Sequence, residues 1–165
     1  MTLIKSISGI RGTIGSHPGE ALTPIDIVRF TAAFAEFIDK TTTRNNRLMV
    51  VGRDARISGG MVCDIVVGTL MAMGFDVVNI GLASTPTTEM AVVGEEACGG
   101  LILTASHNPA QWNALKMLNE HGEFLNAEEG ARVLEIADSK DYTFAPVDKL
   151  GREFVNTTYN RRHIE

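Results

Sequence analysis

The chain has 165 residues, of which 44% are hydrophobic and 21% charged, a composition typical of one globular domain with an apolar core. Its net charge of −5 argues against a general affinity for nucleic acid or for an anionic membrane, although a local basic cluster can still bind a small anion. The sequence contains no apolar run long enough for a signal peptide or a membrane span, so we expect a cytoplasmic protein. Cys63 and Cys98 lack metal-binding or redox spacing, and we expect both to be small buried hydrophobic side chains.

Strands and helices are predicted to alternate along the chain. Short apolar or β-branched runs predict strands at residues 4–8, 47–54, 75–82, 99–105 and 114–118. Apolar residues at helical spacing, each set preceded by a polar loop or a capping residue, predict helices at residues 24–37, 61–73, 85–93 and 127–136. The glycines between residues 9 and 19 predict a loop. Residues 139–165 have weak periodicity, so we expect a domain of residues 1–138 and then a tail or linker.

This alternation predicts an α/β fold with three α/β/α layers, in which helices flank a mostly parallel, mixed sheet. In such a sheet, the strands that end at Gly52 and Thr104 would release their following loops at the same edge. We therefore expect residues 53–60 and 105–113 to meet at the edge where α/β folds bind their ligands.

Ser106 follows an apolar strand, in a turn that the Asn108–Pro109 pair favours. One interpretation is an ordinary strand-ending turn, in which Ser106 and Asn108 bond nearby backbone groups. A hydrolase nucleophile elbow is disfavoured, because the glycines of G-x-S-x-G are missing around this serine. A third interpretation is a phosphorylated serine, which carries about −1.5 to −2 charges and needs positive partners.

Four basic residues are predicted in loops or strand ends near this edge, and each is either such a partner or a solvated surface charge: Arg11, Arg53, Arg56 and Lys116. Lys116 is also a candidate proton carrier for a sugar hydroxyl. Asp54 is expected to pair with a loop arginine and to orient it. The 165 residues contain no D-x-D-x-D run, HExxH motif or EF-hand loop, so no metal-binding motif is complete.

Four segments together resemble the α-D-phosphohexomutase family: SGIRG (8–12), GRDARISG (52–59), STPT (84–87) and TASHNP (104–109). With Asn113 and Lys116 downstream, their order and spacing are similar to the family's N-terminal domain over about residues 3–138. The resemblance implies that Ser106 is a phosphoryl carrier. It would donate its phosphate to a hexose 1- or 6-phosphate and recover one from the hexose 1,6-bisphosphate after that sugar reorients.

The resemblance also implies Mg²⁺ on the serine phosphate, with His107, Arg11 and Lys116 near the reacting groups and Lys116 as general acid and base. It implies support of the substrate or the loop by Arg53, Asp54, Arg56, Asn108 and Asn113. The implied partners are hexose phosphates, hexose 1,6-bisphosphate and later domains of the same chain.

Two departures from the family pattern affect these expectations. The family continues N-G-x-K, whereas Ala114 follows Asn113 here, so the backbone must take a conformation that alanine tolerates. The family's acidic metal loop, sugar-selecting loop and distal phosphate loop belong to later domains, so residues 1–165 alone are expected to be inactive. TASHNP in place of SASHNP favours a phosphoglucomutase or phosphomannomutase. The alternatives are a phosphoglucosamine mutase and a sugar-phosphate-binding module without chemistry.

Overall fold

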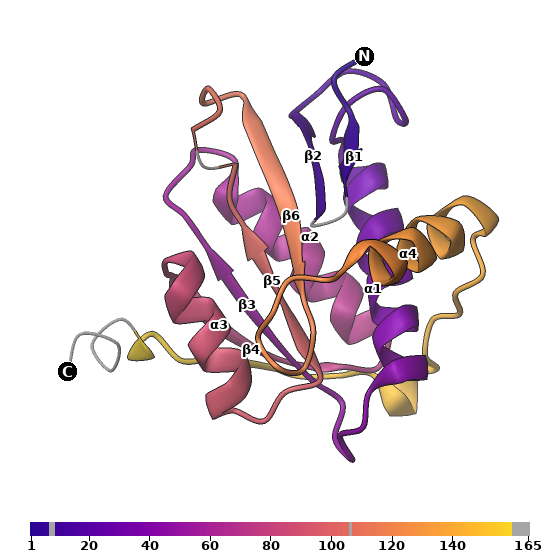
Figure 1. The fold of residues 1–165 in the computed structure, drawn as a ribbon, viewed down its shortest axis with the longest axis vertical. Helices are drawn as coiled ribbons and strands as arrows, with labels where there is room; N and C mark the ends of the chain where they lie inside the picture. The colour runs from indigo at the N-terminus through magenta and orange to yellow at the C-terminus, as the bar shows by residue number, and fades with distance from the viewer. Residues whose placement is uncertain (7–8, 106, 160–165) are drawn as a thin grey trace.

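The computed structural model describes residues 1–6, 9–105 and 107–159, and these residues form one seven-stranded sheet with helices on both faces (Figure 1). The strands are β1 (Ile4–Ser6), β2 (Gly9–Thr13), β3 (Leu48–Arg53), β4 (Asp76–Leu82), β5 (Gly99–Leu103), β6 (Trp112–Leu118) and β7 (Glu153–Val155). The helices are α1 (Pro24–Thr41), α2 (Gly59–Ala72), α3 (Thr85–Gly94), α4 (Ala127–Ser139) and the short 3₁₀ helix η1 (Val147–Lys149). The predicted α/β fold is confirmed.

The sheet has a parallel half and an antiparallel half. Its strand order is β1-β2-β6-β5-β3-β4-β7. Strands β5, β3, β4 and β7 pair in parallel, whereas β6, β2 and β1 pair antiparallel to their neighbours. In the parallel half, β3 and β5 end at the same edge of the sheet, as the sequence predicted. In the antiparallel half, β6 and β2 lie beside β5.

Two apolar clusters lie on opposite faces of the sheet. The larger cluster packs α1, α2 and α4 against one face and includes Phe30, Phe34 and Leu70, all fully buried. The smaller cluster packs Ala91 and Val92 of α3 against the other face. The result is the expected arrangement of three layers, which removes a large apolar area from water. Among the described residues, the helices are too short or too polar to cross a membrane.

Capping residues set the starts of three helices as the sequence predicted. At α1, the Thr23 side chain accepts from the backbone of Asp26, whose carboxylate accepts in return from the backbone of Thr23. Asn126 and Glu129 form the same reciprocal capping box at α4. At α3, the Ser84 side chain accepts from the backbone of the third residue of the helix. These bonds satisfy amide groups that a helix start leaves without a partner.

The glycine-rich segment after β1 differs from its prediction as a loop. Residues 9–13 form β2, which pairs with β6, whereas residues 7 and 8 of the predicted first strand lie outside the described residues. A Cβ atom at Gly9 would lie 2.2 Å from the carbonyl oxygen of Leu115. The glycine is therefore needed for a close approach of two strands and not for a turn.

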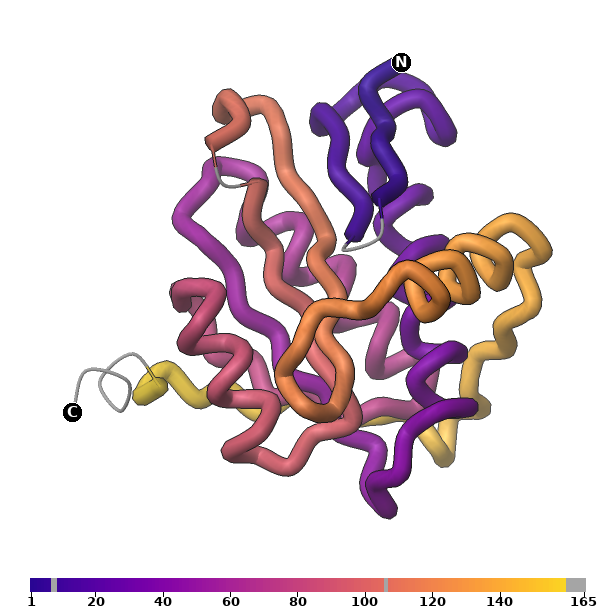
Figure 2. Tube along the Cα trace, viewed as in Figure 1, coloured from indigo at the N-terminus to yellow at the C-terminus, as the bar shows by residue number. Residues whose placement is uncertain are grey.

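The segment after α4 contains a short strand that the sequence did not predict. The trace leaves α4 and crosses behind the sheet to its opposite edge, as Figure 2 shows. There β7 pairs in parallel with β4, so that Phe154 lies opposite Val78. The sequence pattern did not indicate this strand because it has only three residues and all of them are exposed.

Both cysteines are buried and free, as predicted. Burial raises the pKa of the Cys63 thiol to about 11. This thiol therefore stays protonated at neutral pH, which makes it a poor nucleophile and a poor metal ligand.

The carboxylate of Glu120 connects the turn after β6 to the end of α1. It accepts hydrogen bonds from the side chain and backbone of Thr43, and Thr42 and Arg44 add weaker contacts. These interactions, led by the Thr43 hydroxyl, hold the pKa of Glu120 below its ordinary value of 4.5. A lowered pKa stabilises the fold above the unfolded-state pKa, and this contribution is lost as the pH falls through the folded-state value.

We expect Glu120→Gln to lower the free energy of unfolding by about 1–2 kcal/mol at pH 7, because hydrogen bonds to a charged acceptor are weakened. The difference from the wild type should shrink as the pH falls below the unfolded-state pKa and through the lowered folded-state pKa, where the wild-type carboxylate becomes protonated. Urea unfolding at a series of pH values measures this difference. Glu123→Gln, an exposed position on the same turn, is the matched control and should change stability by less than about 0.5 kcal/mol. A Glu120→Gln penalty that is constant from pH 7 to pH 3 would contradict this account.

Candidate functional site

The loops after β3 and β5 meet at one edge of the sheet, as the sequence predicted. The two strands are parallel and in register, with Arg53 opposite Leu103, so their chains leave the sheet side by side. The Thr104 hydroxyl donates to Oδ2 of Asp54 at 2.7 Å, and the Asp54 amide donates to the carbonyl of Leu103 at 3.1 Å. This edge is where α/β sheets bind their ligands.

Arg56 binds the backbone of the opposite loop. Its guanidinium donates to the carbonyl oxygens of Asn108 at 2.8 Å, Pro109 at 2.7 Å and Trp112 at 3.2 Å. Its Nε atom lies 3.3 Å from Oδ2 of Asp54, which is the pairing with a loop arginine predicted for that carboxylate. The Arg56 side chain is only 11% exposed. It is therefore placed to hold the loop and not to meet a ligand from solution.

Arg53 is directed back onto its own loop. Its Nη1 atom donates to the carbonyl of Asp54 at 3.1 Å. A Cβ atom built at Gly59 would lie 3.2 Å from the same nitrogen, so the arginine packs closely over the start of α2. The structure places Arg53 beside the site and outside the residues that line its cavity.

A second connection between the two loops is buried below them. Asn113 is fully buried, and its Nδ2 atom donates to the hydroxyl of Ser58 at 2.9 Å. Ser58 precedes α2 at the N-cap position, but its side chain makes no capping bond. Sequence reasoning missed Ser58 because a serine before a helix normally indicates a cap.

The alanine at position 114 is explained by its place in the fold. Ala114 lies inside β6, where it pairs with Arg11 of β2. Its backbone has no positive φ angle, so the freedom of glycine is not needed there. The family lysine that follows, Lys116, keeps its position two residues further along the strand.

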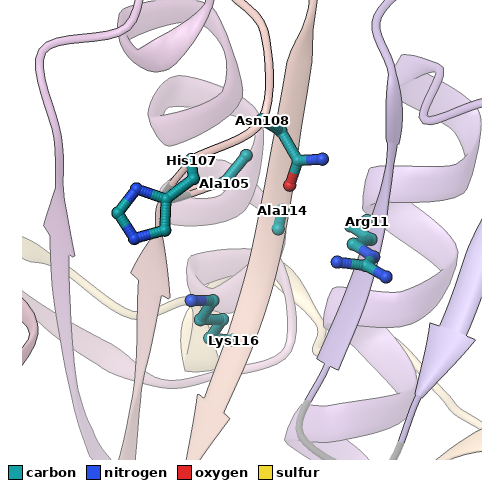
Figure 3. Close-up of a pocket in the computed structure, with 6 residues that line it drawn as sticks. All are labelled: Arg11, Ala105, His107, Asn108, Ala114 and Lys116. Carbon is teal, nitrogen blue, oxygen red and sulfur yellow. The ribbon is translucent and has the colours of Figure 1, made fainter.

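A cavity of about 360 Å³ opens beside this edge (Figure 3), and the described residues that line it are Arg11, Ala105, His107, Asn108, Ala114 and Lys116. The Lys116 ammonium group points toward the His107 ring, and Arg11 enters from β2. A smaller cavity of about 170 Å³ adjoins it and shares Arg11, Ala114 and Lys116.

The strand register explains why the two cations share one cavity. Arg11 lies directly opposite Ala114, so both side chains lie on the same face of the antiparallel pair. Lys116 is two residues beyond Ala114 and therefore lies on that face as well. The intervening Leu115 points to the other face, where it is fully buried in the larger apolar cluster.

The cavity has the electrostatic character of an anion site. Arg11 and Lys116 carry positive charge at neutral pH, and the described residues that line the cavity include no carboxylate. Arginine and lysine are the usual partners of phosphate groups. Ser106 itself lies outside the described residues, but its sequence neighbours Ala105 and His107 both line the cavity.

The described residues do not by themselves fit a metal ion. In residues 1–6, 9–105 and 107–159, no three His, Cys, Asp or Glu side chains gather as a ligand set. A hard cation such as Mg²⁺ prefers carboxylate and phosphate oxygens. The Mg²⁺ implied by the family resemblance would therefore need ligands from outside these described residues.

The fold and the cavity define an α/β domain with a cationic cavity next to the ends of parallel strands. A family model described as phosphoglucomutase/phosphomannomutase, alpha/beta/alpha domain I, matches residues 3–144. A phosphoglucomutase/phosphomannomutase of Thermococcus kodakarensis is 36% identical over 165 residues, which cover 95% of this chain and 35% of that protein. A phosphoglucosamine/phosphogalactosamine mutase of Sulfurisphaera tokodaii is 35% identical over 121 residues, or 73% of this chain and 25% of that protein.

The fold is also similar to a crystal structure of a phosphoglucomutase/phosphomannomutase family protein from Burkholderia thailandensis, with a TM-score of 0.80 at 22% identity. That match covers 96% of this chain and 34% of the other. The chain therefore belongs to the phosphoglucomutase/phosphomannomutase family, in which it corresponds to domain I. It spans about a third of the length of its relative from Thermococcus kodakarensis.

Proposed function

We propose that this domain carries the phosphoserine of a phosphohexomutase, which interconverts hexose 1-phosphate and hexose 6-phosphate, and that Ser106 is the phosphoryl carrier. The observation that supports the proposal is the cavity that Arg11 and Lys116 line together with the sequence neighbours of Ser106. A hydroxyl that carries phosphate needs cations on its phosphate oxygens more than it needs an activating base.

The proposed reaction is two phosphoryl transfers, the first from Ser106 to the sugar and the second, of a different phosphoryl group, from the sugar back to Ser106. A sugar hydroxyl attacks the phosphorus on Ser106, a new bond from phosphorus to the sugar oxygen forms, and the bond from phosphorus to the serine oxygen breaks. Lys116 gives a proton to the departing serine oxygen and takes the proton of the attacking hydroxyl, so the number of protons is unchanged. After the bisphosphorylated sugar reorients, Ser106 recovers a phosphoryl group from the other position.

Arg11 and Lys116 have a second role in this proposal, which is electrostatic. Negative charge spreads over the oxygens of the transferring phosphoryl group, and fixed cations beside it lower the barrier. His107 borders the same space and is a neighbour of the reacting groups. Mg²⁺ bound to the serine phosphate would add positive charge there.

We further propose that the remaining catalytic parts come from other domains, because this chain spans only 35% of its Thermococcus kodakarensis relative. Residues 1–165 alone should then bind a hexose bisphosphate weakly and show no mutase turnover. Turnover by residues 1–165 alone would contradict this part of the proposal. Sugar selection would rest largely with the other domains.

Lys116→Met should weaken the binding of hexose 1,6-bisphosphate to residues 1–165 by about tenfold or more, because a charged hydrogen bond to phosphate contributes about 1.5–3 kcal/mol. Isothermal titration calorimetry measures the dissociation constants. Methionine keeps most of the side-chain length and apolar stem of lysine, which limits the structural disturbance.

The matched control is Lys40→Met, which makes the same change of charge at an exposed position in the last turn of α1. We expect this variant to bind the bisphosphate within about twofold of the wild type, since exposed distant charges are screened. Equal losses in the two variants would mean that overall charge, and not the cavity, binds the ligand.

A further inference from the structure

Thr104 is a residue for which the sequence suggested no role beyond its place in the TASHNP segment. It directly follows β5, is 9% exposed and stands two positions before Ser106 in the chain. Its hydroxyl donates to Oδ2 of Asp54, on the neighbouring loop, at 2.7 Å. This bond ties the start of the Ser106 loop to the loop after β3.

The same carboxylate also holds the far end of the Ser106 loop, through Arg56. Oδ1 of Asp54 accepts from the Arg56 backbone amide at 3.1 Å, and Oδ2 accepts from Nε of Arg56 at 3.3 Å. The Arg56 guanidinium then donates to three carbonyl oxygens of residues 108–112. One carboxylate therefore fixes both ends of the loop, and Thr104 supplies the contact at the start.

We propose that Thr104 is a positioning residue for phosphoryl transfer, acting through Asp54 and Arg56 on the loop that contains Ser106. The inference rests on the proposed function. A valine has nearly the shape of threonine but cannot donate a hydrogen bond, so Thr104→Val would remove the side-chain bond from the start of the loop to Asp54, while the backbone bond from the Asp54 amide to Leu103 remains. A small misplacement of a reacting group is sufficient to lower a transfer rate by one or two powers of ten.

The hydroxyl, and not the methyl group, carries this role. Serine at position 104 supplies the same donor, so Thr104→Ser should keep the contact with Asp54.

The test compares the wild type, Thr104→Val and Thr104→Ser in the protein expressed from its complete reading frame. Mass spectrometry follows the rate at which hexose 1,6-bisphosphate phosphorylates Ser106, calorimetry gives the dissociation constant, and thermal unfolding gives Tm. We expect Thr104→Val to be labelled about tenfold more slowly, with bisphosphate affinity within about twofold of the wild type. Thr104→Ser should be labelled at close to the wild-type rate.

Two further measurements separate positioning from a general loss of stability. Thr69→Val removes another largely buried hydroxyl, one that bonds the Ile65 carbonyl within α2, and should leave the labelling rate unchanged. Amide hydrogen exchange at Asn108 and Trp112, whose N–H groups bond the Ala105 and Pro109 carbonyls, should accelerate in Thr104→Val alone.

The outcomes distinguish this inference from the proposed function. A wild type that is never labelled at Ser106 would overturn the proposed function and the positioning role together. A labelled wild type with Thr104→Val labelled at the same rate would overturn the positioning role alone. If Ser106 were phosphorylated equally slowly in Thr104→Val and Thr104→Ser, the positioning role would also be overturned, because loss of the hydroxyl group would not explain the slower rate.

Discussion

Gly9→Ala is expected to destabilise the domain by about 3 kcal/mol and to abolish most of the proposed binding of hexose 1,6-bisphosphate. The added Cβ atom would lie 2.2 Å from the carbonyl oxygen of Leu115 and 3.0 Å from the Cα atom of Lys116. Both neighbours are backbone atoms of β6, so no side-chain rotation can relieve the overlap. The strands must move apart, which weakens the ladder between β2 and β6.

The expected loss of binding follows because β2 carries Arg11, which lines the cavity. Arg11 reaches the cavity only because β2 lies against β6 in the observed register. When β2 shifts, Arg11 moves away from Lys116 and the paired positive charge is lost. Thermal unfolding and calorimetry with hexose 1,6-bisphosphate measure the two effects, and the expected fall in Tm is about 6–12 °C for a domain of this size.

Gly60→Ala is the matched control for this substitution. Gly60 lies in the first turn of α2, is exposed, and has no neighbouring heavy atom within 4 Å of the position of an added Cβ atom. Alanine favours a helix over glycine by up to about 1 kcal/mol, so this variant should be neutral or slightly more stable. If Gly9→Ala unfolded at the wild-type temperature, the close approach of β2 and β6 would not be needed by the fold.

The parts of the fold that the sequence predicted correctly have local signals. Thr23 with Asp26, and Asn126 with Glu129, indicate helix starts through bonds that span three residues. The parallel pairing of β3 and β5 follows from the alternation of strands and helices, and it explains why the two polar loops meet. Local chemistry was sufficient for these features.

The missed features depend on contacts between distant segments. The pairing of β2 with β6 joins residues about one hundred positions apart, and only the absence of a side chain at Gly9 permits it. The bonds from Thr104 to Asp54 and from Asn113 to Ser58 each cross about fifty residues. Such contacts have no periodicity and no local turn chemistry, so the sequence of a single chain does not indicate them.

The basic residues of the site also depend on contacts that the sequence does not indicate. Four were candidates for a charged partner of phosphate, and the structure separates them into two kinds. Arg11 and Lys116 line the cavity, whereas Arg53 and Arg56 bond backbone carbonyls of the surrounding loops. Residue type indicated a basic site, but the strand register and the loop contacts decided which side chains face the cavity.

Ser106→Ala is expected to have the largest functional effect of any single substitution in the chain. If Ser106 carries the phosphoryl group, alanine removes the only atom that can form the bond to phosphorus, and no residual transfer through this position remains. The fold should persist, because the Ala105 carbonyl keeps its bond to the Asn108 amide and the substitution removes a single oxygen atom. Tm within about 3 °C of the wild type would show that the loss is chemical.

The most direct test is a phosphopeptide measurement on the protein expressed from its complete reading frame. The wild type and Ser106→Ala are incubated with hexose 1,6-bisphosphate, and their peptides are analysed by mass spectrometry. We predict one added phosphate on Ser106 of the wild type, no phosphate on the same peptide of the variant, and transfer of the label to added hexose phosphate. A wild type that binds the bisphosphate but never carries phosphate on Ser106 would contradict the phosphoryl-carrier role and would indicate a sugar-phosphate-binding domain without chemistry.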